Sequence, residues 1–231
     1  MNKINKGIIL LSGGLDSLVS IAAMKTTDFQ LALTFDYGQK SFKKEEEASK
    51  KIAKFYGIEH KIIELKWLKE ITQTSLVSDK KIPELDKNSL DNLEITTGSC
   101  ASVWVPNRNG LFVNIAAAFA DSLGYETVVI GANKEEAATF PDNSKEFIEN
   151  INKSLKYSAL KKVEVVAPLI DLNKEEIIKR GIEEDAPIEL INSCYASDER
   201  HCGKCESCSR DRKSTRLNSS HSGQSRMPSS A

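Results

Sequence analysis

The sequence lacks a long apolar run, a charge imbalance and an internal repeat. No apolar run approaches the roughly 20 residues that a membrane-spanning helix needs, so we expect no membrane association. The 32 Lys and Arg residues nearly balance the 33 Asp and Glu residues, which argues against a protein that coats nucleic acid. The N-terminal apolar run, residues 7–11, is too short for a signal peptide and indicates a cytoplasmic location. The 231 residues are enough for one sizeable core.

Cysteine is also scarce, except in one cluster near the C-terminal end. Cys194, Cys202, Cys205 and Cys208 have the spacing C-x7-C-x2-C-x2-C. Two-residue gaps let successive thiolates face one ion, and four sulfur ligands suit Zn²⁺. An iron–sulfur cluster is the competing interpretation. A closed zinc site with four thiolates has no open coordination position, so we expect a structural metal. Cys100 stands apart and is more simply a small apolar residue.

The last 18 residues differ in kind from the rest of the chain. Residues 214–231 (STRLNSSHSGQSRMPSSA) contain no acidic residue and no apolar periodicity, so we do not expect them to fold. They are either a disordered terminus or a non-native addition from cloning, sequencing or gene assembly. We therefore expect one folded domain over residues 1–193, a zinc-binding segment of the same domain over 194–208, and this tail.

Strand and helix patterns alternate along the body of the chain. We expect strands over residues 7–11, 30–35, 60–65, 127–130 and 163–167. Helices are expected over residues 16–25, 43–55, 111–123 and 145–160, and from a cap at Asn173 to Arg180, with Gly181 closing the last one. Residues 72–102 read as a loop-rich insertion. This order predicts an α/β fold with a doubly wound, mostly parallel five-stranded sheet, which binds ligands at the carboxyl ends of its strands.

The glycine-rich stretch SGGLDS, residues 12–17, follows the first strand and opens a helix. Its two glycines allow a tight turn, and the N–H groups and dipole of the helix favour a phosphate. It is not a Walker A loop, because the lysine of that motif is missing, nor is it GxGxxG. A loop without that lysine suits release of pyrophosphate after attack at the α-phosphorus, which leaves an adenylate. Capping of the helix by Asp16 and Ser17 is the simpler role, and it is compatible with phosphate binding.

SGGLDS after a first strand resembles the PP-loop ATP pyrophosphatase superfamily, which has the adenine nucleotide alpha hydrolase-like fold. Members of that superfamily adenylate a carbonyl or carboxyl oxygen and then admit a nucleophile. The resemblance implies ATP contacts around the loop and at the end of the second strand. The implied residues are Leu11, Ser12, Gly13, Gly14, Leu15, Asp16, Ser17, Leu18, Val19, Phe35, Asp36 and Tyr37.

Further sequence motifs restrict the resemblance to one family within this superfamily. They include FDYGQ (35–39), VPNRN (105–109), FPD (140–142) and the cysteine cluster. Together with SGGLDS they resemble the 7-cyano-7-deazaguanine synthase family over residues 6–208. The resemblance implies a ligase that forms carbon–nitrogen bonds from 7-carboxy-7-deazaguanine, ammonia and ATP. It also implies adenylated acid and amide intermediates, release of AMP and pyrophosphate, Mg²⁺ with the ATP, a structural Zn²⁺ and a homodimer.

The candidate catalytic residues are Asp16, Ser17, Arg108 and Asp142. Arg108 is a candidate to hold the substrate carboxylate or the transferring phosphate, with a surface salt bridge as the alternative. Asp142 is a candidate to accept hydrogen bonds from the guanine-like edge of the substrate, or it is only a turn residue. Lys174 is more simply a solvated helix charge than a phosphate ligand. The acidic run at residues 45–47 reads as a solvated helix face.

The chain departs from the family pattern at several positions. Ser41 and Phe42 stand where a histidine is common, and Asn143 stands where cysteine is common. Asn107 replaces a glycine and is able to adopt similar backbone angles. After Cys208 the family continues with an Arg-x-x-Ala-Phe-like stretch, whereas residues 209–213 here lead into the serine-rich tail.

Two rival functions remain open from the sequence. One is another PP-loop adenylating enzyme that acts on tRNA bases, for example in thiolation. Such an enzyme needs a basic tRNA-binding face, which the mildly acidic body disfavours. The other rival is a zinc-containing nucleotide-binding module on a degenerate fold, which the intact SGGLDS disfavours.

Overall fold

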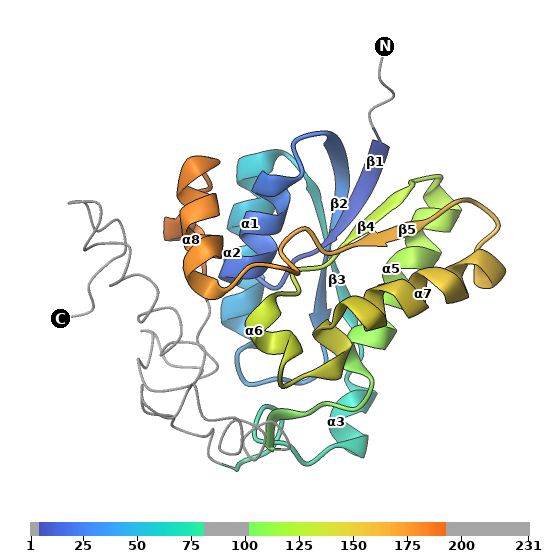
Figure 1. Cartoon of the computed structure of the whole chain (residues 1–231). Coiled ribbons are helices and arrows are strands. Elements are labelled where there is room, and N and C mark those ends of the chain that lie inside the picture. Colours follow the sequence, from blue (N-terminus) through green and yellow to red (C-terminus); the bar gives the residue numbers. More distant parts are fainter. Residues whose placement is uncertain (1–4, 81–101, 193–231) are drawn as a thin grey trace.

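The computed structural model describes residues 5–80 and 102–192. Within them, the centre of the molecule is one five-stranded sheet in which every pairing is parallel. The strand order is β3-β2-β1-β4-β5, and Figure 1 shows helices on both faces of the sheet. The strands are β1 (Asn5–Leu10), β2 (Thr27–Asp36), β3 (Glu59–Glu64), β4 (Thr127–Val129) and β5 (Glu164–Val166). The predicted doubly wound α/β fold is therefore confirmed.

The helices cover the sheet because successive strand residues face opposite sides. Ile8 and Leu10 of β1 face the core cluster that includes Val113 and Ala116, whereas Ile9 and Leu11 face the cluster that includes Ile52. The α-helices are α1 (Leu15–Ala23), α2 (Phe42–Tyr56), α3 (Trp67–Ile71), α5 (Arg108–Leu123), α6 (Lys134–Ala137), α7 (Lys145–Ser158) and α8 (Lys174–Glu183). Helices α1 and α2 thus cover one face, and α5 and α7 cover the other (Figure 1).

Every strand and long helix predicted from the sequence is present, with ends that differ by a few residues. The prediction missed the short helices α3 and α6 and the 3-10 turns η1 (Pro141–Asn143) and η2 (Ile188–Leu190). These elements are too short to show a helical repeat in their residues. Among the described helices, none combines the length and the apolar character that a membrane span requires.

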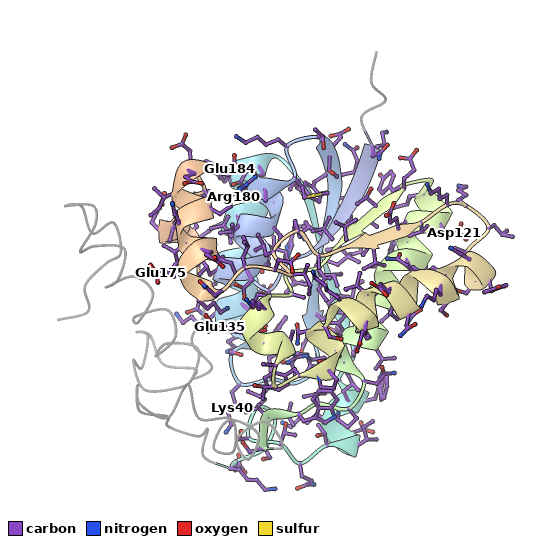
Figure 2. All side chains as sticks on the ribbon, in the orientation of Figure 1. Lys40, Asp121, Glu135, Glu175, Arg180 and Glu184 are labelled. Carbon is purple, nitrogen blue, oxygen red and sulfur yellow. The ribbon has the colours of Figure 1, made fainter. Side chains whose placement is uncertain are left out.

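The prediction that Gly181 closes the last helix is wrong. Helix α8 continues to Glu183, and an ion pair between Arg180 and Glu184 (2.8 Å) spans its last turn (Figure 2). Gly181 is buried inside the helix, where an added Cβ would lie 2.9 Å from Cγ2 of Val19. The glycine therefore allows α8 to pack closely on α1, and this packing outweighs the low helix propensity of glycine.

Candidate active site

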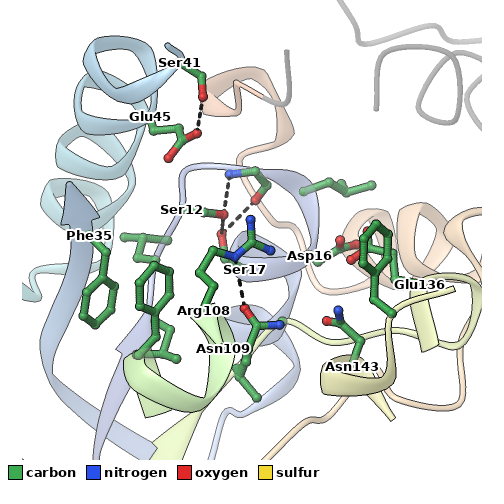
Figure 3. A pocket seen from close by; sticks show the side chains of 18 of the residues that line it. Ser12, Asp16, Ser17, Phe35, Ser41, Glu45, Arg108, Asn109, Glu136 and Asn143 are labelled. Atoms are coloured by element: carbon green, nitrogen blue, oxygen red, sulfur yellow. Dashed lines mark hydrogen bonds between the residues drawn. The ribbon is translucent and has the colours of Figure 1, made fainter. Parts of the chain in front are cut away.

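A cavity of about 250 Å³ opens at the carboxyl ends of β1, β2 and β4 (Figure 3). Its lining includes Leu11 after β1, Phe35 at the end of β2 and Ile130 after β4. The neighbours of β1 in the sheet are β2 on one side and β4 on the other, so the chain winds away in opposite directions from this strand. Open parallel sheets bind ligands at such a switch point.

The glycine-rich loop lies in this cavity in a conformation that only glycine adopts easily. Gly13 has a φ of +77°, and an added Cβ would lie 2.8 Å from Cβ of Ala48 and 2.9 Å from the carbonyl oxygen of Glu45. Gly14 is the N-cap of α1, and no side chain caps this helix end. Ser17 Oγ donates to the Gly14 carbonyl (3.0 Å) and so caps none of the helix N–H groups. The N–H groups of the first turn of a helix have no acceptor within the helix, and together with the helix dipole they favour an anion at this position.

The start of the loop is oriented by hydroxyl groups behind it. The carbonyl oxygen of Leu11 accepts hydrogen bonds from Thr34 Oγ1 (2.6 Å) and Ser49 Oγ (3.0 Å). Because a trans peptide places its C=O and N–H on opposite sides, the N–H of Ser12 points away from these hydroxyls. The hydroxyl of Thr34 uses its hydrogen on Leu11, so it accepts the bond from Nε2 of His60 (2.8 Å).

Lys174 is buried, so its interpretation as a solvated helix charge is wrong. Its side chain is 8% exposed, and its Nζ lies 2.5 Å from Asp16 Oδ2 and 3.2 Å from Glu136 Oε1. Asn133 Nδ2 also donates to Asp16 Oδ2 (3.2 Å). Asp16, Glu136 and Lys174 all line the cavity, so this end of it carries one buried cation between two carboxylates.

Arg108 lines the cavity from the first residue of α5. Its Nη1 lies 3.4 Å from the hydroxyl of Tyr37, and its guanidinium carbon lies 5.9 Å from the centre of that ring. The preceding residue, Asn107, has a φ of 52°, which confirms that asparagine adopts the backbone angles expected of the family's glycine. Burial raises the pKa of Tyr37, and the positive charge of Arg108 offsets part of the effect. Tyr37 therefore keeps its proton and remains a hydrogen-bond donor at neutral pH.

Aromatic rings form the apolar side of the cavity. The rings of Phe35 and Phe112 stack with centroids 4.0 Å apart and an interplanar angle of 6°. Phe140 also lines the cavity and lies parallel to Trp104, with centroids 6.3 Å apart. Flat aromatic surfaces of this kind suit a planar heterocycle.

Asp142 does not line the cavity, although its neighbour Asn143 does. The carbonyl oxygen of Asp142 accepts a hydrogen bond from Asn109 Nδ2 (3.3 Å). Burial raises the pKa of the Asp142 carboxyl, and the charge of Arg108 lowers it in part. From this segment, Phe140 and Asn143 therefore reach the cavity, whereas Asp142 acts on it through Arg108 and Asn109.

The prediction that the whole acidic run lies on a solvated face is wrong for Glu45. Its carboxyl lines the cavity, where Oε1 accepts from Ser41 Oγ (2.5 Å) and Oε2 accepts from Gln39 Nε2 (2.9 Å). The neighbouring acidic residues do lie on the outside of α2, where Glu46 pairs with Lys50 at 2.5 Å. The run thus divides between the cavity and the solvent.

Nine of the predicted nucleotide and catalytic residues line the cavity together. They are Leu11, Ser12, Gly14, Leu15, Asp16, Ser17, Phe35, Tyr37 and Arg108. Gly13, Leu18, Val19 and Asp36 do not line it: Gly13 packs against α2, Leu18 and Val19 are core residues of α1, and Asp36 accepts a hydrogen bond from the N–H of Gly38 (3.0 Å). The structure adds Glu45, Glu136 and Lys174, none of which the sequence placed in the site.

The predicted zinc ligands Cys194, Cys202, Cys205 and Cys208 lie outside the described residues, as do Cys100 and the tail over 214–231. Within residues 5–80 and 102–192, no group of three or more His, Cys, Asp or Glu side chains is arranged to hold a metal ion.

Comparison with known proteins identifies close relatives of the chain. The family model described as "Queuosine biosynthesis protein QueC" matches residues 6–218. The 7-cyano-7-deazaguanine synthase of Methanobrevibacter smithii is 49% identical over 213 residues, which cover 92% of this chain and 93% of the relative. The enzyme of the same name from Pelotomaculum thermopropionicum is 50% identical over 207 residues, covering 89% of this chain and 94% of the relative.

A solved structure with a similar fold is the U34-tRNA thiolase NcsA from Methanococcus maripaludis with its [4Fe-4S] cluster. The TM-score is 0.51 at 19% identity, and the match covers 96% of this chain and 69% of that one. At this identity the likeness concerns the fold alone.

Proposed function

The chain belongs to the QueC family, and on that premise we propose that it converts 7-carboxy-7-deazaguanine to 7-cyano-7-deazaguanine with ammonia and ATP. The enzyme is then a ligase of queuosine or archaeosine precursor synthesis. A carboxylate is a poor electrophile, so one oxygen must first become part of a good leaving group. Adenylation of the acid, attack by ammonia, adenylation of the amide and loss of AMP give the nitrile.

The observation that carries this proposal is the arrangement of the loop around its cavity. The N-terminus of α1 and the buried ammonium of Lys174 both lie at the end of the cavity next to Asp16. Lys174 supplies from α8 the positive charge that a Walker A lysine would supply from the loop. We propose that these groups bind the pyrophosphate leaving group, so that the α-phosphorus faces the substrate oxygen.

The remainder of the cavity suits the second substrate. We propose that the deazapurine ring lies against the aromatic side of the cavity and that Arg108 binds its carboxylate, while Phe35 at the end of β2 contacts the nucleotide. Asn109 and Asp142 hold this region in place through their mutual hydrogen bond. The same loop then serves both adenylation steps, because each is an attack on an α-phosphorus.

Two metal ions belong to the proposal. Mg²⁺ in nucleotide enzymes is usually held by one or two carboxylates together with the substrate phosphates, and Asp16 and Glu136 lie together in the cavity as such a pair. Mg²⁺ would neutralise charge on the phosphates of ATP. The four cysteines are a donor set that fits a structural Zn²⁺. We also propose a cytoplasmic homodimer, in keeping with the expectation from the sequence.

The proposed function is tested by mass spectrometry of the products. The protein is incubated with ATP, Mg²⁺, ammonium and 7-carboxy-7-deazaguanine. We expect the nitrile, AMP and pyrophosphate, and no AMP when the deazapurine is left out. ADP and phosphate as products, or AMP formation that does not need the deazapurine, would contradict the proposal.

A further inference from the structure

The adenylation chemistry proposed above leaves the carboxyl of Glu45 without a role, although it lies in the cavity wall. Its two hydrogen-bond donors, Ser41 and Gln39, are neutral. Gln39 is itself fixed, because its Nε2 donates to the Phe35 carbonyl (2.9 Å) and its Oε1 accepts from the Tyr37 N–H (3.0 Å). Each carboxylate oxygen has a second lone pair, so the held carboxyl is able to accept further hydrogen bonds from a small ligand.

The carboxyl of Glu45 lies apart from the ion pairs that Lys174 makes in the cavity. The other carboxyls of the lining, Asp16 and Glu136, both contact Lys174. Figure 3 shows Glu45 and Asp16 on different sides of Arg108. Glu45 therefore lies away from Lys174, with its backbone next to Gly13 of the loop, and its carboxyl is close enough to Arg108, the proposed ligand of the substrate carboxylate, to feel that charge.

The charges around Glu45 favour a base. Burial raises the pKa of its carboxyl, and the nearby charge of Asp36 raises it further, whereas Ser41, Gln39 and the charge of Arg108 lower it in part. These groups come from the end of β2, the start of α2 and the start of α5, and Tyr37 faces the carboxyl as well. A carboxylate with a raised pKa takes a proton more readily than one in water.

We propose that Glu45 binds the ammonium ion that supplies the nitrogen and takes its proton, so that ammonia forms beside the adenylated carboxyl at Arg108. The inference rests on the proposed function and names the binding site of the ammonium ion and the base that takes its proton. Ammonium predominates over ammonia at neutral pH and has no lone pair with which to attack. A base next to the acyl carbon is therefore needed.

Ammonium gives one proton to the Glu45 carboxylate and becomes ammonia. The lone pair of ammonia forms the C–N bond at the acyl carbon, and the C–O bond to the phosphate breaks with its electron pair leaving on AMP. The nitrogen then carries three hydrogens and a positive charge, and loss of one proton to solvent gives the amide.

The test measures each half-reaction separately in the variant Glu45→Gln. The matched control is Glu47→Gln, because Glu47 lies on the exposed side of the same helix. Exchange of labelled pyrophosphate into ATP, with the acid present and ammonium absent, measures adenylation alone. Amide formation is then measured with ammonium, and hydroxamate formation with hydroxylamine, which is a weaker base than ammonia and is mostly neutral at neutral pH. Conversion of added amide to nitrile measures the second adenylation without any need for ammonium.

For Glu45→Gln we expect unchanged exchange, hydroxamate formation and amide conversion, with the ammonium-dependent step slowed about 100-fold or more. Glu45→Asp, which keeps the charge, should recover part of that rate. Unchanged amide formation from ammonium would overturn the inference. So would a loss of exchange or of amide conversion, because Glu45 would then serve another step. If the unmodified protein shows no acid-dependent exchange, the proposed function itself is wrong, and the inference fails with it.

Discussion

At the scale of single residues, the site depends on backbone positions that tolerate no side chain. Gly13 combines a φ of +77° with an approach to α2 that leaves no room for a Cβ. Gly131 has a similar constraint, since an added Cβ would lie 2.9 Å from the backbone nitrogen of Ser17. The loop is thus held from both sides at distances that only glycine permits.

Replacement of Gly13 by alanine tests this constraint. We expect a loss of about 1–3 kcal/mol of unfolding free energy, because the Cβ meets both a strained φ and the atoms of α2. We also expect loss of pyrophosphate exchange, because the loop must move. Gly57→Ala is the matched control: Gly57 has a φ of +68° and nothing within 4 Å of its Cβ position, so it carries the backbone strain alone. Equal effects of the two substitutions, measured by denaturation and exchange, would contradict the role of close packing.

Residue patterns predicted the loop but not the charged side chains that complete the cavity, among them Glu45 and Lys174. SGGLDS can be recognised from the sequence because its glycines, the start of the helix and the preceding apolar strand are all local features. Glu45 lies three and four residues before the buried Ala48 and Ser49, so helical spacing did place it on the inner face of α2. Because Glu45 belongs to a run of three acidic residues, the sequence prediction assigned the whole run to the solvent and missed the position of Glu45. Lys174 stands in the first turn of α8, where the helix dipole disfavours a cation, and this anomaly was the only sequence signal for its role.

At the scale of elements, the cavity is built by helices that approach the ends of β1 from both faces of the sheet. Helix α8 packs on α1 and carries Lys174 to Asp16, whose position in the sequence is 158 residues away. Helix α5 brings Arg108 from the opposite face. Such long-range pairings do not follow from the periodicity of either helix alone, so the sequence predicted the helices but not their contacts.

The contribution of α8 is tested by Lys174→Met, which removes the charge and keeps most of the volume. We expect pyrophosphate exchange to fall about 100-fold or more, because the ammonium no longer stabilises charge on the phosphates. Lys179→Met, on the exposed face of the same helix, should leave exchange unchanged. If Lys174→Met retains its exchange rate, Lys174 is only a structural partner of Asp16.

At the scale of the whole molecule, segments from the entire described chain meet at the loop. The carbonyl of Gly13 accepts a hydrogen bond from the N–H of Asn192 (2.8 Å), at the end of the described residues. Ala48 of α2 and Gly131 after β4 contact the loop from other sides. The anion site therefore forms only when the complete sheet and its helices have folded, which is why the strands and helices could be predicted while the shape of the cavity could not.

In the proposed reaction, both oxygens of the substrate carboxylate leave as part of AMP. This transfer is tested most directly with 7-carboxy-7-deazaguanine that carries oxygen-18 in both carboxylate positions, followed by mass spectrometry of AMP, pyrophosphate and the nitrile. We expect two molecules of AMP for each nitrile, each AMP with one oxygen-18, and no label in pyrophosphate. Label in pyrophosphate or inorganic phosphate, or AMP without label, would contradict attack of the substrate oxygens on the α-phosphorus.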